Sequence, residues 1–87
     1  MMTENRFKGK TVGVYGLGKS GIAVARTMVD LEARVILFDG SNDKISTLID
    51  QLGLPPSAHG DFDRDGAFLD FLYPTPGLHV THPVRTI

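Results

Sequence analysis

Apolar residues gather in two short continuous runs, residues 11–15 and 34–38, separated by a proline-free segment with helical spacing. Short continuous apolar runs are typical of strands buried in a parallel sheet. The segment between them runs from Lys19 to about Leu31, and its apolar side chains recur on one helical face: Ile22, Ala23, Ala25 and Val29. The pattern predicts a strand–helix–strand unit with a right-handed crossover and both strand ends on one side.

The second half of the chain continues the alternation. Apolar residues at helical spacing predict a helix over 43–52, closed by Gly53: Ile45, Leu48, Ile49 and Leu52. Two prolines stop it, and the segment 57–60 is either a short third strand or an irregular link. Residues 67–73 predict a further strand. A proline in the first turn then predicts that a helix begins at Thr81-His82-Pro83.

These elements indicate an α/β fold, a Rossmann-like and mostly parallel sheet of three to four strands with flanking helices. The predicted domain spans residues 10–87 and follows a flexible lead-in, residues 1–9, from which Phe7 packs under the first strand. A doubly wound domain usually has more than 87 residues, so the sequence predicts a truncated version of the fold.

Composition narrows the classes of partner. The net charge is −1 and the basic residues are scattered, which argues against binding of nucleic acid or an anionic membrane. The absence of cysteine excludes disulfides and thiolate metal sites. No signal peptide or stretch of about 18 apolar residues is present, so we expect a cytoplasmic protein.

Three glycines after the first predicted strand form the pattern G-x-G-x-x-G at positions 16, 18 and 21. In dinucleotide-binding loops the first glycine permits a tight turn, the second lets a pyrophosphate approach the backbone, and the third allows close helix packing. A helix beginning near Lys19 would direct unpaired N–H groups and its positive dipole end at a phosphate.

The same stretch also satisfies a rival pattern, because residues 13–20 read G-x-x-x-x-G-K-S, the phosphate loop of nucleoside triphosphatases. In that geometry the strand would end at Val12 and leave Val14 and Tyr15 in the loop. The length of the apolar run favours a strand that continues to Tyr15. A glycine-rich turn without any ligand is the third interpretation.

Asp39 follows the second predicted strand and lies 18 residues beyond Gly21. Nicotinamide-binding domains place an acid near this offset against the ribose. In the rival scheme the same residue would act as a Walker B aspartate. Alternatively, Asp39 together with Ser41 and Asn42 simply starts the next helix.

Other candidate chemistry is weak. The acidic stretch 61–66 has the D-x-D-x-D spacing of a calcium loop, but Leu72 stands where an EF-hand requires glutamate. The three histidines are too dispersed for a metal triad: His59, His79 and His82. We therefore predict no metal site and no catalytic residue.

Together, the glycine loop, the strand ending in Asp39, Thr75-Pro76-Gly77 and Thr81-His82-Pro83 resemble the N-terminal domain of the D-glutamate-adding Mur ligases. That family typically shows a GLGxSG loop and an S-P-G turn near an H-P pair. The resemblance spans residues 8 to 84. Thr75 in place of serine and Pro74 just before the turn depart from the family pattern.

The resemblance implies a site for the UDP part of the substrate, UDP-N-acetylmuramoyl-L-alanine. The site residues that it implies follow the pattern of the family: Gly16, Gly18, Lys19, Ser20, Asp39, Gly40, Ser41 and Gly77. Residues 18–20 would contact the diphosphate through backbone N–H groups and the Ser20 hydroxyl. Residues 39–41 would border the uracil, and Gly77 would approach the uridine or sugar.

The resemblance also implies that this chain lacks the family's central domain, which carries the ATP phosphate loop and the magnesium ligands, and its third domain. We therefore expect no cofactor here, and ATP and Mg²⁺ in the full-length enzyme. The fragment alone should be inactive, and a sheet edge or face left uncovered would favour self-association. The alternatives are an NAD(P)-binding oxidoreductase domain, a phosphate-loop nucleotidase, and a domain whose only activity is association.

Overall fold

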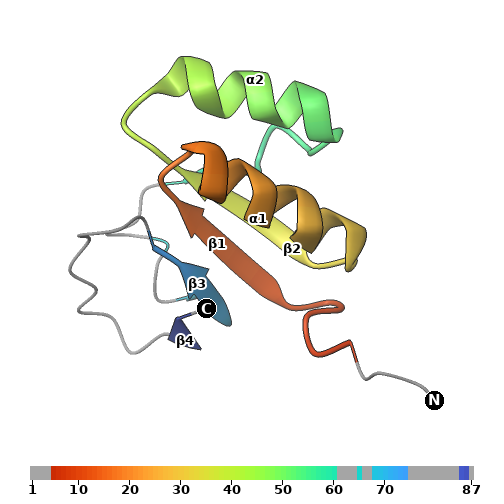
Figure 1. Cartoon of the computed structure of the whole chain (residues 1–87). Coiled ribbons are helices and arrows are strands. Elements are labelled where there is room, and N and C mark those ends of the chain that lie inside the picture. Colours follow the sequence, from red (N-terminus) through yellow and green to blue (C-terminus); the bar gives the residue numbers. More distant parts are fainter. Residues whose placement is uncertain (1–4, 61–64, 66–67, 75–84, 87) are drawn as a thin grey trace.

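The computed structural model describes residues 5–60, 65, 68–74 and 85–86, which form a parallel sheet covered on one side by two helices (Figure 1). The element order is β1 (Thr11–Tyr15), α1 (Lys19–Asp30), β2 (Arg34–Phe38), α2 (Asn42–Leu52), β3 (Phe71–Tyr73) and β4 (Arg85–Thr86). The sheet has the order β2-β1-β3-β4, and each pair of neighbours is parallel. This confirms the predicted α/β fold class.

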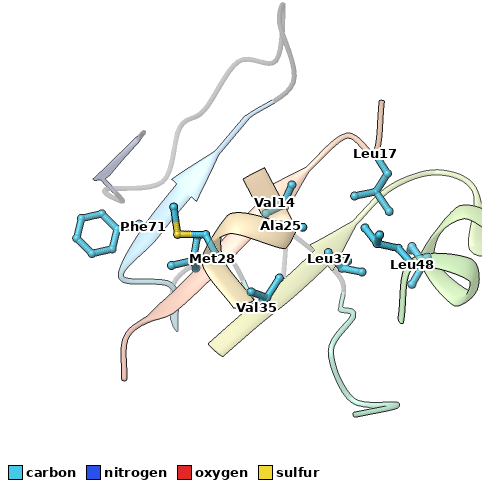
Figure 2. Close-up of a cluster of buried hydrophobic side chains, with 10 residues drawn as sticks. Val14, Leu17, Ala25, Met28, Val35, Leu37, Leu48 and Phe71 are labelled. Carbon is cyan, nitrogen blue, oxygen red and sulfur yellow. The ribbon is translucent and has the colours of Figure 1, made fainter. Parts of the chain in front are cut away.

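Alternate residues of the first two strands face the helices. Val12 and Val14 of β1 and Val35 and Leu37 of β2 are buried on that face. Figure 2 shows how side chains from α1, α2 and the glycine loop meet them: Ala25, Met28, Leu48 and Leu17. Burial of this apolar surface, at roughly 25 cal/mol per Å², is the main force that holds the helices on the sheet.

The helices match their predicted ranges to within one residue. Within α1 the buried face differs from the predicted one, because Ala23 is exposed and Met28 is buried. Alanine's small size made it compatible with either face, whereas the long methionine reaches the core. In α2, Ile45 and Leu48 are buried as the periodicity indicates.

The link after α2 is neither a full strand nor wholly irregular. Ala58 accepts a hydrogen bond from the Leu37 N–H at 2.8 Å, and His59 forms a single parallel bridge with Leu37 on the outer edge of β2. Across the sheet, β2 therefore lies on one side of β1 with His59 beyond it, and β3 lies on the other side of β1. The direction of chain progression reverses between β1 and β3.

Two predictions for the last third of the chain differ from the structure where its residues are described. The strand predicted over 67–73 is confirmed at Phe71–Tyr73 and does not include residues 68–70, while residue 67 lies outside the described residues. Before the strand, the Leu69 side chain lies over Gly13 and the Asp70 carboxylate accepts the Thr11 N–H at 2.8 Å. The predicted helix start, Thr81-His82-Pro83, lies outside the described residues. A helix that continues from it to the end of the chain is contradicted at Arg85–Thr86, which pair with β3 as strand β4. Arg85–Thr86 form a strand because they pair in parallel with β3, and the local sequence does not reveal this pairing.

The amino-terminal segment packs against the end of the sheet. The Asn5 side-chain amide donates to the Leu31 carbonyl at 2.8 Å. The ring of Phe7 meets that of Phe71 edge-on, with centroids 5.0 Å apart, and the Arg6 guanidinium lies over both rings. Phe7 thus packs against Phe71 of β3 and the core cluster that the sheet shares with the helices, whereas the sequence predicts contact with the first strand.

Candidate functional site

The glycine loop joins the end of β1 to the start of α1. Because β1 includes Gly13 and runs on to Tyr15, the phosphate-loop interpretation of residues 13–20, which requires the strand to end at Val12, is wrong. Gly13 has a packing reason to lack a side chain, since an added Cβ would press on Leu69 and Phe38. The G-K-S match is therefore a coincidence of spacing.

Each glycine of the G-x-G-x-x-G pattern has a different environment. Gly16 makes the turn with a φ of +96°, in the region that favours glycine. At Gly21 an added Cβ would overlap the carbonyl oxygen of Gly16, so this glycine lets α1 begin directly against the turn. At Gly18 an added Cβ would meet no atom of the described residues within 4 Å. The fold uses the first and third glycines, while the second faces open space.

The start of α1 has unpaired donors. Gly18 is the N-cap residue, no side chain of the described residues caps this end, and the first turn carries no acid. Intrahelical bonding begins with the Ile22 N–H, which donates to the Gly18 carbonyl at 2.9 Å. The N–H groups of residues 19–21 therefore have no intrahelical acceptor and lie at the positive end of the helix dipole, an arrangement suited to a phosphate. Lys19 and Ser20 are exposed beside them.

Asp39 lies directly after β2, and both its carboxylate oxygens accept backbone hydrogen bonds. Oδ2 accepts from the Leu17 N–H at 2.7 Å, and Oδ1 accepts from the Ser41 N–H at 2.8 Å. The hydrogen bond from Leu17 is the main cause that holds the pKa of Asp39 below its ordinary value, and the bond from Ser41 is the second. Partial burial raises the pKa, and the positive charge of Lys44 lowers it further. Asp39 is thus an anion at neutral pH that ties the loop to the end of β2.

The helix-start interpretation of this region is right for Ser41 and not for Asp39. Ser41 is the N-cap of α2, and its Oγ accepts the Lys44 N–H at 3.3 Å. Asp39 instead bonds to the Ser41 N–H outside the helix. Gly40, between them, is exposed.

The starts of α1 and α2 lie at the same end of the sheet (Figure 1). This end is the carboxyl edge of the parallel strands, and the reversal between β1 and β3 makes it a topological switch point, where open α/β sheets bind ligands. The structure brings seven of the eight predicted site residues to this edge: Gly16, Gly18, Lys19, Ser20, Asp39, Gly40 and Ser41. The eighth, Gly77, lies outside the described residues.

Leu17 is a participant that sequence reasoning missed. Its side chain is buried under the loop at 2% exposure, while its N–H is the donor to Asp39. The pattern G-x-G-x-x-G treats this position as arbitrary, since a backbone donor leaves no trace in residue type. The apolar character of Leu17 was the available sign that the loop packs inward here.

Two hollows differ in their position relative to this edge. One of about 290 Å³ lies between α1 and α2 and is lined in part by Leu17, Ile22 and Leu48, so it borders the glycine loop. A larger one of about 580 Å³ is lined in part by Thr11 and Arg34, which begin β1 and β2 at the opposite edge. Size alone therefore does not mark the site.

Within the described residues, no group of three or more His, Cys, Asp or Glu side chains could hold a metal ion. Neither helix in that part of the chain has the length and hydropathy needed to cross a membrane.

These features define a class: a Rossmann-like α/β domain with a nucleotide-type glycine loop at a topological switch point. Similarity to known proteins is more specific. UDP-N-acetylmuramoylalanine--D-glutamate ligases of Mesorhizobium japonicum and Brucella abortus are 31% and 34% identical to the chain over 84 residues, which is 95% of this chain and 17% of each relative. The enzyme of that name from Elusimicrobium minutum is 31% identical over 85 residues. The predicted resemblance to the D-glutamate-adding Mur ligases is confirmed, over a length consistent with their N-terminal domain.

The chain spans less than one fifth of the length of these relatives, 17–18%. No model of a protein family matches it. Among solved structures, Salmonella D-lactate dehydrogenase superposes with a TM-score of 0.65 at 30% identity, over 84% of this chain and 20% of the dehydrogenase. This likeness supports the Rossmann-like fold.

Proposed function

We propose that residues 10–87 form the UDP-substrate-binding domain of an ATP-dependent ligase that adds D-glutamate to UDP-N-acetylmuramoyl-L-alanine in peptidoglycan synthesis. The observation that carries the proposal is the similarity to proteins of that name over 95% of the chain. The open start of α1 supports it, because the loop offers donors to an anion where the fold itself makes no use of Gly18.

In this proposal the diphosphate sits over residues 18–20. Its oxygens accept from backbone N–H groups at the start of α1 and from the Ser20 hydroxyl, and the Lys19 ammonium adds favourable charge. Gly18 allows the phosphate to approach the backbone, since a side chain there would project into the same open space. The Gly16 N–H does not take part, because it donates to the Phe38 carbonyl at 2.9 Å. Gly16 contributes the turn.

The nucleoside then lies toward the end of β2, with residues 39–41 beside the uracil. Gly77 would complete the uridine or sugar side. This division follows the resemblance to the Mur ligases. It is supported by the pairing of β1 with β2, which makes the loops after these two strands neighbours.

In the full-length enzyme we propose that ATP transfers its terminal phosphoryl group to the substrate carboxylate, which gives an acyl phosphate and releases ADP. The D-glutamate amine then attacks the acyl phosphate, and phosphate leaves as the amide forms. ATP, Mg²⁺ and the catalytic groups belong to parts beyond this chain. Residues 10–87 would contribute binding energy and orientation, which fix the reacting carboxylate at a distance from the UDP anchor. We place this reaction in the cytoplasm.

The proposal is tested by calorimetric titration of the chain with UDP and with NADH. We expect saturable UDP binding, and stronger binding of UDP than of NADH. Ser46→Ala, on the exposed side of α2, serves as a control and should leave UDP binding unchanged. Saturable binding of NADH with no response to UDP would overturn the proposal.

That opposite result would favour the second candidate, a nicotinamide-binding domain of an oxidoreductase. The structural likeness to a dehydrogenase and the position of Asp39 at the end of β2 support it. Against it, both Asp39 oxygens already accept backbone hydrogen bonds, so the carboxylate is less available to ribose hydroxyls.

A further inference from the structure

The Asp39 carboxylate joins two segments that are far apart along the chain. Oδ2 binds the Leu17 N–H of the glycine loop, 22 residues earlier, and Oδ1 binds the Ser41 N–H at the start of α2. One side chain therefore connects the turn before α1 with the turn before α2. Both bonds have a charged acceptor and are short, 2.7 and 2.8 Å, as expected for strong hydrogen bonds.

We infer that Asp39 is a positioning residue, whose carboxylate holds the glycine loop in the conformation that receives a diphosphate. This inference rests on the proposed function, since it assigns a role within the same site.

The loop divides its backbone donors into two sets. The N–H groups of Gly16 and Leu17 both point to the end of β2, to the Phe38 carbonyl and the Asp39 carboxylate. The N–H groups that follow, from Gly18 into the first turn of α1, have no acceptor among the described side chains. The bond to the Leu17 N–H and the burial of the Leu17 side chain together restrict how the following peptide group can turn. Without the carboxylate, the Leu17 N–H would lose its partner in a part-buried position and the loop would be free to turn.

An acid beside a phosphate site is unfavourable by charge alone, because like charges repel. Here the two N–H donors and Lys44 favour the ionised form, so Asp39 keeps its negative charge at neutral pH. Removal of this charge therefore has two opposing effects on anion binding. Reduced repulsion would strengthen binding of an anion, whereas loss of the loop's anchor would weaken it.

Inorganic pyrophosphate separates a positioning role from contact with the nucleoside, because it has neither sugar nor base. We would titrate the 87-residue chain and Asp39→Asn with pyrophosphate and with UDP. Asparagine keeps the size, but its amide NH₂ must face one of the two N–H donors. We expect both ligands to bind about tenfold more weakly, in line with loss of one hydrogen bond to a charged group.

Asp43→Asn is the matched control. Asp43 lies in the first turn of α2, is exposed, and carries the same charge near the same edge. Its removal should leave pyrophosphate binding unchanged or slightly stronger, as repulsion alone predicts.

Amide NMR of the wild-type chain provides a readout that needs neither ligand nor a variant. As the pH falls through the pKa of Asp39, the Leu17 and Ser41 amide protons should shift together, because both donate to its carboxylate. Amide protons at these two positions that do not respond would overturn the inference.

Pyrophosphate binding by Asp39→Asn that equals or exceeds that of the wild type, together with weaker UDP binding, would also overturn the inference in favour of direct nucleoside contact. It would leave the proposed function standing. Absence of UDP binding by the wild type would instead overturn the proposed function, so the two failures are distinguishable.

Discussion

The two helices of this domain differ in how their ends are capped. At its start α2 has the Ser41 cap and Asp43 in the first turn, and it ends at Gly53 in the left-handed conformation, with φ of +66°. α1 has Gly18 as its N-cap, with no side-chain cap from the described residues and no acid in its first turn, and it is followed by Glu32, whose φ is +64°. The chain supplies good caps where only the fold benefits, and leaves the start of α1 open at the edge where we propose that a diphosphate binds.

The largest expected effect comes from removing the close contact on which the start of α1 depends. In Gly21→Ala the new methyl group would overlap the Gly16 carbonyl oxygen, so the loop and helix must separate. We expect a loss of about 3 kcal/mol in the free energy of unfolding, a large share of a small domain's stability. Urea denaturation measures it. Gly18→Ala is the control, and a loss there as large as at position 21 would contradict this explanation.

Gly18→Ser makes the start of α1 resemble that of α2. A serine hydroxyl can cap the helix, and the position has open space for it. We expect the free energy of unfolding to stay within about 0.5 kcal/mol of wild type, while UDP binds about tenfold more weakly because the hydroxyl competes for the same N–H groups. Ala23→Ser, on the exposed face of α1, should not affect binding. Undiminished UDP binding by Gly18→Ser would argue against an open helix start as the anion site.

Ser41→Ala makes the start of α2 resemble that of α1. Loss of the bond from the Lys44 N–H to Ser41 Oγ should cost about 1 kcal/mol, which lowers Tm by about 4–8 °C in a domain of this size. Thermal unfolding followed by circular dichroism measures this. Ser46→Ala, an equal substitution inside α2, should slightly raise Tm because alanine favours helix. Equal effects of the two variants would show that the cap contributes nothing.

Glu32→Gly makes the C-terminal end of α1 resemble that of α2, which is followed by Gly53. Glu32 lies in a helix-terminating motif, in which the Ala33 N–H donates to the Met28 carbonyl at 3.0 Å, and its left-handed backbone favours glycine. We expect a gain of about 0.5 kcal/mol, since relief of strain exceeds the added entropy of the unfolded chain. The ion pair with Lys8 is too exposed to matter. Glu32→Gln keeps the strained backbone, so a similar gain in that variant would contradict the explanation.

Local sequence was sufficient where short-range physics decides the structure. The apolar runs placed β1 and β2, the helical spacing with Gly53 placed α2, and the glycine pattern placed the turn before α1. Seven predicted site residues accordingly lie at one edge of the sheet. The roles assigned to Asp39 stayed open, because the partners of its carboxylate are backbone groups, which carry no mark in the sequence.

By itself the sequence determined the α/β class, the strand–helix–strand unit and the glycine loop, because each follows from side-chain periodicity or from the backbone freedom of glycine. Only the tertiary structure decided that Arg85–Thr86 form a strand, that His59 contributes a single bridge, and that Gly13 lies under Leu69. It also decided that Asp39 holds Leu17. These features depend on pairings between distant segments, whose free energy comes from contacts that exist only once the sheet has formed.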